Sequence, residues 1–284
     1  MIARSTNLDQ PLKQGFTAME KPITDPMQSN ISGADASYSP SNNPLFYETL
    51  QAKFPGALPL SEYLQQTRAA LEPYGFDDQN TMGMVLACRD EITEPLLHGV
   101  IEHWGKTFNC CSLGGFMIMG KTGLAAATHH LPLIDGVRRF VFYAMPHIAI
   151  SQAGEIGIVN REGLEKSSHA CGALSEIVKE LSQGHLNLQT DMQDLEQSII
   201  RQKLLSALRY GEQPDLVDIT KLACRVIFSD VSQLLENLDP KLYMYAVMTG
   251  IQVHGPMDTQ WIYPQEAYVM ASDRHSMQLG TVSA

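Results

Sequence analysis

The sequence has no cluster of basic residues. Its 20 lysines and arginines are outnumbered by 31 aspartates and glutamates, which gives a formal net charge of −11. Nucleic acids and anionic membrane surfaces bind proteins largely through patches of lysine and arginine. We therefore expect no nucleic acid and no membrane among its partners.

Long apolar runs and disulfide-type cysteine patterns are also missing. No stretch reaches the roughly 20 apolar residues that a membrane-spanning helix needs, and the amino terminus lacks the charged-then-apolar pattern of a secretory signal. Five cysteines, an odd number in 284 residues, fit a reducing compartment better than a disulfide framework. The expected location is the cytoplasm, or the chloroplast stroma if the chain comes from an alga.

The chain divides by composition into a short arm and a globular domain. Residues 1–45 are rich in serine, asparagine and proline with little apolar periodicity, which predicts a flexible amino-terminal arm. Residues 46–284 form the predicted catalytic domain. The whole chain is 44% hydrophobic and 18% charged, as is usual for a globular enzyme.

The order of predicted elements is mixed, and it indicates an α/β fold. Helical spacing of apolar residues predicts helices over 61–75, 94–104, 171–181, 186–209 and 216–237. Apolar or β-branched runs predict strands over 82–88, 139–151, 157–159, 242–253 and 260–270. No internal repeat of solenoid length is present.

Two thiol-bearing segments carry the candidate chemistry. Cys88 and Asp90 follow a buried strand, whereas His169 and Cys171 open a helix. Ligands of open α/β sheets collect at the carboxyl ends of strands and the amino ends of helices. Two thiolates, one imidazole and a carboxylate are a complete set for a zinc site with an open fourth position.

These segments resemble the β-type carbonic anhydrases, and more closely the limiting-CO2-inducible protein B family, also described as θ-type carbonic anhydrases. The matching segments lie mainly between residues 80 and 180, and the resemblance extends to most of the chain after residue 45. They are Cys88-Arg89-Asp90-Glu91, Cys111-Ser112-Leu113-Gly114-Gly115 through Gly120-Lys121-Thr122-Gly123, His130-Leu131-Pro132, Pro146-His147-Ile148-Ala149-Ile150, Gly157-Ile158-Val159 and Ser168-His169-Ala170-Cys171-Gly172-Ala173.

The resemblance implies a β-carbonic-anhydrase-like sheet flanked by helices and a lyase that interconverts carbon dioxide and bicarbonate. Zn²⁺ would be held by Cys88, His169 and Cys171, and would lower the pKa of a bound water toward about 7. Asp90 would accept a hydrogen bond from the resulting hydroxide, or would bind zinc in a resting state. The resemblance also implies a homodimer with its sites near the interface, in a system that concentrates inorganic carbon.

Two departures from the β-type pattern leave alternatives open. The spacing here is His169-Ala170-Cys171 instead of His-x-x-Cys. The arginine expected two residues after the aspartate is replaced by Ile92. Arg89 is our candidate partner of Asp90 in catalysis, with Arg138, Arg139 and Arg161 as substitutes. The missing arginine also allows a catalytically silent, zinc-binding partner subunit of the same fold.

Other candidate residues have competing interpretations. Phe116, in the apolar run 116–119, and His130 are candidates for lining a substrate pocket, whereas His147 could equally be a core histidine. Residues 115–122 match the spacing of a phosphate-binding loop, but that apolar run is poorly suited to cradle phosphates. A metal-free hydrolase with Cys171 as nucleophile and a histidine as base is a further alternative.

Overall fold

The computed structural model describes residues 43–161, 163–184, 187–209, 211–270 and 276–278. These residues belong to one unit of the chain, Ala36–Ala284. The predicted flexible arm, residues 1–45, lies outside the described residues except at its end, where helix α1 begins at Pro44. The arm therefore stays a prediction.

A nine-stranded sheet forms the centre of this unit, with the main strand order β1-β10-β9-β5-β2-β3. Strands β9, β5, β2 and β3 run parallel to one another, and β10 pairs antiparallel with β9. Three shorter strands lie outside this order: β4 pairs with β5, β6 with β9, and β11 with β10. The strands are β1 (Leu58–Pro59), β2 (Thr81–Leu86), β3 (Thr107–Asn109), β4 (Leu133–Ile134), β5 (Val137–Ala144), β6 (His147–Ala149), β9 (Tyr243–His254), β10 (Gln260–Met270) and β11 (Ser276–Gln278).

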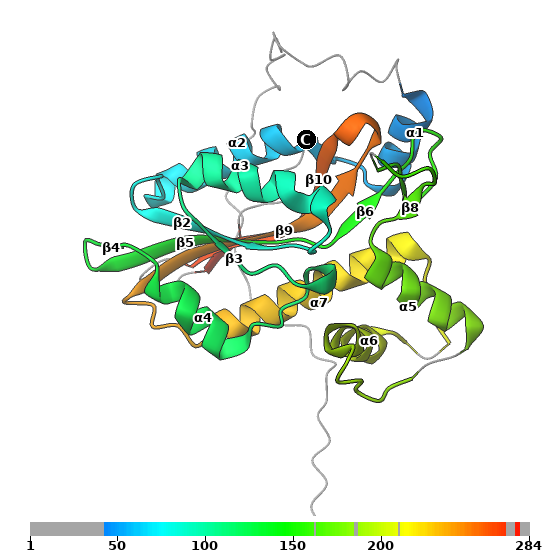
Figure 1. The fold of residues 1–284 in the computed structure, drawn as a ribbon. Helices are drawn as coiled ribbons and strands as arrows, with labels where there is room; N and C mark the ends of the chain where they lie inside the picture. The colour runs from blue at the N-terminus through cyan, green and yellow to red at the C-terminus, as the bar shows by residue number, and fades with distance from the viewer. Residues whose placement is uncertain (1–42, 162, 185–186, 210, 271–275, 279–284) are drawn as a thin grey trace, which may run out of the picture. The chain divides into compact units, whose positions relative to one another are not determined.

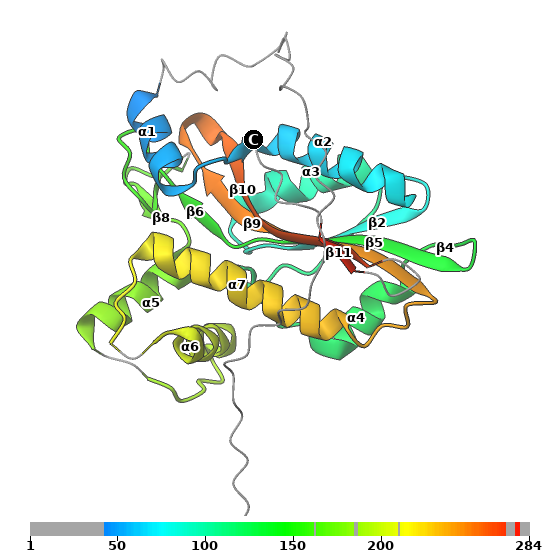
Figure 2. The same ribbon diagram turned by 180° about the vertical axis from the view of Figure 1, so that it is seen from behind.

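Helices cover both faces of the sheet (Figure 1), and the reverse view agrees (Figure 2). One layer holds α2 and α3, and the opposite layer holds α4 and α7, with α5 and α6 on the same side. The described α-helices are α1 (Pro44–Lys53), α2 (Leu60–Leu71), α3 (Glu94–Trp104), α4 (Gly120–His129), α5 (Gly172–Gln183), α6 (Leu195–Ala207) and α7 (Leu216–Leu235). The α/β class and the flanked sheet predicted from the sequence are confirmed.

Strand β2 shows why the sheet needs two helical layers. Every residue of Thr81–Leu86 is buried, as is typical of a parallel strand covered on both faces. Met84 and Leu86 pack in the core shared with α4, α5 and α7, whereas Val85 packs in the core shared with α2 and α3. Successive side chains of a strand point to opposite faces, so one apolar run supplies both cores.

Helix α6 is shorter than its sequence pattern predicts. The pattern over 186–209 predicts one helix, but the helix begins only at Leu195. Just before it, the side-chain oxygens of Asn187 and Asp191 accept hydrogen bonds from the backbone N–H groups of Gln189 and Gln193. Such local bonds compete with helical hydrogen bonding and favour turns.

The parallel alignment decides where polar side chains gather. Strands β2, β5 and β9 end at Leu86, Ala144 and His254, and their carboxyl ends lie at one edge of the sheet. Among the helices that the structure describes, none is both long and apolar enough to cross a membrane.

Candidate metal centre

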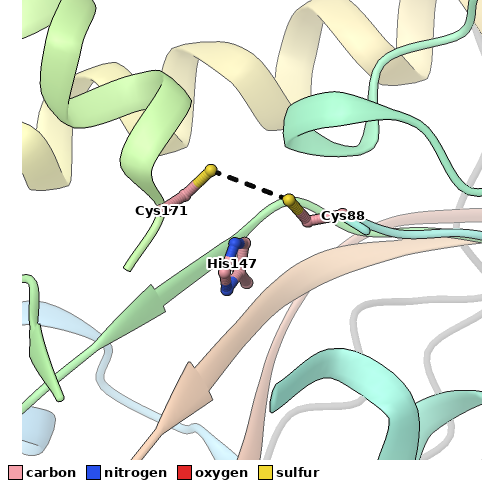
Figure 3. Close-up of side chains that lie close together, drawn as sticks. All are labelled: Cys88, His147 and Cys171. Carbon is pink, nitrogen blue, oxygen red and sulfur yellow. Dashed lines mark hydrogen bonds between the residues drawn. The ribbon is translucent and has the colours of Figure 1, made fainter. Parts of the chain in front are cut away.

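Three buried side chains from different elements meet at this edge. The potential ligand atoms of Cys88, His147 and Cys171 all lie within 4.8 Å of one another. The two sulfur atoms are 3.9 Å apart. Figure 3 shows the two thiols pointing toward each other and the imidazole of His147 beside them. Two thiols and one imidazole form a donor set suited to a transition metal.

The local backbone positions each of these three residues at this edge of the sheet. Cys88 comes two residues after β2, and its carbonyl oxygen accepts a hydrogen bond from Thr93 Oγ1 at 2.8 Å. Pro146 follows the end of β5, and His147 then begins β6 beside β9. Cys171 occupies the N-cap position of α5.

Tight packing of the loop after β3 completes the surroundings of Cys88. The backbone N–H of Gly114 lies 3.3 Å from Cys88 Sγ and donates to it. Gly115 has φ +74°, and a Cβ at this position would lie 3.1 Å from the carbonyl oxygen of Met145. A glycine is therefore required where this loop passes the backbone before His147.

The two thiols titrate as a pair. Their mutual hydrogen bond is the largest cause of a lowered pKa at Cys88 and of a raised pKa at Cys171. Burial opposes the shift at Cys88 and adds to the shift at Cys171. The pair therefore holds one proton at neutral pH, with Cys88 as the thiolate.

His147 presents a free nitrogen to the two sulfurs. Its Nδ1 lies 3.1 Å from Nε2 of His254, whereas its own Nε2 is buried and has no hydrogen-bond partner. A buried polar atom without a partner is costly. Burial is also the largest cause of the lowered pKa of His254, which keeps that ring neutral.

The geometry fits a tetrahedral metal ion. Two thiolates at about 2.3 Å from zinc in tetrahedral geometry have their sulfurs about 3.8 Å apart. The 3.9 Å separation of Cys88 Sγ and Cys171 Sγ matches this value. A metal there would also satisfy the orphaned Nε2 of His147, so the residues present fit such an ion.

A carboxylate and a guanidinium stand next to the three donors. Both carboxylate oxygens of Asp90 accept hydrogen bonds from Arg161 Nη2 at 2.7 Å. Arg161 also donates from Nε to Glu91 at 2.5 Å and from Nη1 to Ser168. Asp90 Oδ2 is 4.0 Å from His147 Nε2. The pair is therefore next to the nitrogen that is free to bind a metal.

The structure corrects the predicted imidazole. His169 does not join Cys88 and Cys171: it lies on β8 (Ser168–His169), opposite Ile158 of β7 (Ile158–Val159), and its side chain is exposed. The pairing of β8 with β7 holds the backbone of this segment extended, so His169 stays at the surface. His147 takes its place beside the two thiols.

The predicted arginine is also corrected. Arg89 donates to Glu196 at 2.7 Å and its side chain is 61% exposed. Its guanidinium therefore pairs with Glu196 and not with Asp90. The partner of Asp90 is Arg161, which the sequence named only as one substitute among three.

Neither predicted pocket residue lines the cavity beside Cys88. Phe116 is fully buried in the core cluster that also contains Cys88 and Cys171. His130 is exposed at the end of α4, where its ring contacts Phe108, and β4 then leads to the amino end of β5, at the opposite edge of the sheet. A cavity of about 190 Å³ instead reaches the site, and its lining includes Cys88, Asp90, Val85, Leu97 and Cys111.

His147 and Arg161, which the sequence did not favour, both carried a signal. Pro146-His147 comes directly after the buried run of β5, at a strand's carboxyl end, which is the rule that singled out Cys88. Arg161 follows the short strand β7 within eight residues of His169. Only the pairing of β7 with β8 brings it to Asp90, and that pairing is not visible in the sequence.

Comparison with known proteins shows the family and the fold. A sequence profile described as limiting CO2-inducible proteins B/C, beta carbonic anhydrases, matches residues 57–271. The crystal structure of limiting CO2-inducible protein LCIB is 29% identical, with a TM-score of 0.68 over 81% of this chain and 96% of that chain. PtLCIB4, a homologue of LCIB, is 24% identical, with a TM-score of 0.69 over 82% of this chain and 98% of that chain, and shows the same fold. No curated protein matches the sequence.

Replacing His147 by alanine should remove most bound metal, because it deletes one of three protein donors. The matched change His169→Ala should leave the metal content near that of the parent, because His169 is exposed. Metal analysis of both variants after purification in Zn²⁺ checks this. Full metal in His147→Ala together with loss in His169→Ala would restore the sequence-based assignment.

Metal binding should strengthen as the pH rises. At neutral pH the raised pKa of Cys171 leaves one proton on the thiol pair, and a metal must displace it. The affinity for Zn²⁺ should therefore rise about tenfold per pH unit between about pH 7 and 8.5. Competition with a chelator, corrected for the chelator's own protonation, measures the slope. A pH-independent affinity would contradict binding through this pair.

Proposed function

The chain belongs to the limiting CO2-inducible protein B/C family of β-type carbonic anhydrases, and we propose that it is a zinc enzyme that reversibly hydrates carbon dioxide to bicarbonate. One observation carries the proposal: the Asp90–Arg161 pair lies beside the group formed by Cys88, His147 and Cys171. A purely structural metal site has no need of an oriented carboxylate at its border.

Cys88, His147 and Cys171 are the proposed ligands. Three protein donors leave a fourth tetrahedral position open, which distinguishes catalytic from structural zinc sites. When bound, Zn²⁺ lowers the pKa of a water at that position to about 7 and so supplies a nucleophile near neutral pH. Burial of all three side chains keeps bulk water from competing for the donors.

Asp90 is the proposed acceptor that orients the reacting water. Its Oδ2 lies 4.0 Å from His147 Nε2, so the carboxylate is next to the donors that would hold the metal. Arg161 donates hydrogen bonds to both carboxylate oxygens, which holds the carboxyl group of Asp90 in place. An ionised carboxylate accepts a hydrogen bond from an O–H group, which directs the oxygen lone pair toward the substrate carbon.

The cavity next to Cys88 is the proposed space for the substrate. Val85, Ala87, Leu97 and Cys111 contribute apolar lining, and the polar lining comes from Arg89, Asp90, Thr93, Glu94 and Asn109. Carbon dioxide is small and uncharged, so an apolar wall receives it without loss of hydrogen bonds. Its volume of about 190 Å³ is below the usual range for drug-sized ligands.

The position of Arg161 bears on the silent-subunit alternative. That alternative rested on Ile92, which stands where β-type enzymes have the arginine that pairs with the aspartate. Arg161 supplies this guanidinium from a different segment, with both Asp90 oxygens at 2.7 Å. This aspartate–arginine pair supports the enzyme over the silent subunit.

The metal-free hydrolase is less well supported. Its nucleophile would be Cys171, but this side chain is only 1% exposed and its sulfur faces Cys88. A substrate carbonyl would have to displace the core packing of α5 to reach it. Buried paired thiols with one free imidazole nitrogen are better suited to bind a metal than to attack an ester or amide.

Stopped-flow measurement of carbon dioxide hydration, with metal content determined on the same sample, tests the proposed function. The zinc-loaded protein should accelerate hydration and the chelated protein should not. Zinc binding without any acceleration would favour the silent subunit. Absence of zinc together with esterase or amidase activity would favour the hydrolase.

Changing Asp90 to asparagine should keep the metal and lower hydration activity about 10- to 100-fold, the usual cost of losing an outer-shell partner of a metal site. Arg161→Gln should act in the same direction because it frees the Asp90 carboxylate. Arg225→Gln, at an exposed position of α7 away from this cavity, is the matched control and should be as active as the parent. Parent-like activity in Asp90→Asn would remove this residue from the mechanism.

A further inference from the structure

A row of polar side chains crosses three neighbouring strands behind the metal centre. His147 lies on β6, His254 ends β9, and Gln260 begins β10. Gln260 is directly opposite His254 in the antiparallel pair, and His147 is diagonal to His254 because Ala149 is its direct partner. Side chains in such positions share a face of the sheet and can touch.

The hydrogen bonds along this row have one possible direction. A backbone carbonyl oxygen can only accept, so the carbonyl of Asp258, 3.3 Å away, receives a hydrogen from Gln260 Nε2. Gln260 Oε1 then faces His254 Nδ1 at 2.6 Å and must accept from it. His254 therefore carries its hydrogen on Nδ1, and its Nε2 is an acceptor.

The same direction continues into the metal centre. His147 Nδ1 is 3.1 Å from His254 Nε2, so it must donate, and its hydrogen is on Nδ1. A neutral imidazole has only one N–H, so His147 Nε2 carries a lone pair. That atom is the buried nitrogen without a hydrogen-bond partner, beside the two sulfurs.

We infer that His254 and Gln260 are positioning residues that select the metal-binding tautomer of His147, through a hydrogen-bond chain that begins at the carbonyl oxygen of Asp258. This inference rests on the proposed function, because it concerns the same metal centre. Neither residue touches the substrate. Their effect reaches the metal only through the imidazole of His147.

The opposite tautomers of His254 and His147 would leave the centre unable to bind a metal through His147. With its hydrogen on Nε2, His147 would place a buried N–H where a lone pair is needed. That N–H would instead donate to the Cys88 thiolate and so compete with a metal for this sulfur. A metal ligand whose other ring nitrogen is held by a hydrogen bond is fixed both in tautomer and in ring orientation.

The turn between β9 and β10 holds the Asp258 carbonyl, at which the hydrogen-bond chain begins, in place. Gly255 N–H donates to the Thr259 carbonyl at 2.8 Å, and Thr259 Oγ1 donates to the Pro256 carbonyl at 3.0 Å. Between them, Met257 and Asp258 both have positive φ, 54° and 57°. These bonds fix the direction of the Asp258 carbonyl, from which all the other directions follow.

Two substitutions at Gln260 separate hydrogen bonding from packing. Gln260→Leu removes the acceptor of His254 Nδ1–H, whereas Gln260→Glu keeps an acceptor oxygen of the same reach. Gln260→Leu should weaken Zn²⁺ binding about 10- to 100-fold, and Gln260→Glu should restore most of the affinity. Gln233→Leu, at an exposed site on α7, is the matched control and should bind as the parent does. Chelator competition on each full-length protein gives the affinities.

The tautomer of His254 is a second readout that needs no variant. Long-range ¹H–¹⁵N correlation of the zinc-loaded parent should show the hydrogen of His254 on Nδ1. A hydrogen on Nε2, or equal Zn²⁺ affinity of Gln260→Leu and the parent, would overturn the inference and leave the metal centre intact. A parent that binds no Zn²⁺ would instead overturn the proposed function.

Discussion

Parallel hydrogen bonding of β2, β5 and β9 is the constraint on which the rest of this structure depends. It aligns three strand ends at one edge of the sheet and so places Cys88, His147 and His254 together, although 166 residues separate the first from the last. Helix α5 then brings Cys171 to the same edge by its amino end. The donor set is a consequence of strand direction, and the same donors on an antiparallel sheet would be split between two edges.

The three metal-binding donors and the arginine that holds Asp90 lie on different kinds of element. The buried side chains of Cys88, His147 and Cys171 lie after β2, at the start of β6 and at the start of α5. Arg161, in contrast, comes from a segment beyond β7 and holds Asp90 by side-chain bonds alone. Movement of that segment would release the Asp90 carboxylate and leave the three donors unchanged.

The fold was largely predictable from the sequence, and the site only in part. The continuous apolar run of β2 and the helical spacing of α3 predict both elements because each reflects local burial. Cys88 and Cys171 were found by their place at a strand end and a helix start. His169 was favoured over His147 because it is close to Cys171 along the chain, but strand pairing turns it to solvent.

Arg161 shows a second limit of prediction from the sequence. Arg161 is 71 residues from Asp90, and it reaches the carboxylate because β7 pairs with β8. Pairing between strands of only two residues leaves almost no periodic signal. The contact of Gln260 with His254 was also not predictable, because it depends on the register between β9 and β10.

Anomalous diffraction at the zinc absorption edge, on crystals of the zinc-loaded protein, tests the central claim most directly. The account predicts one strong peak per chain, about 2.3 Å from each of Cys88 Sγ and Cys171 Sγ and about 2.0 Å from His147 Nε2. A peak at His169, or no peak between the two sulfurs, would contradict it.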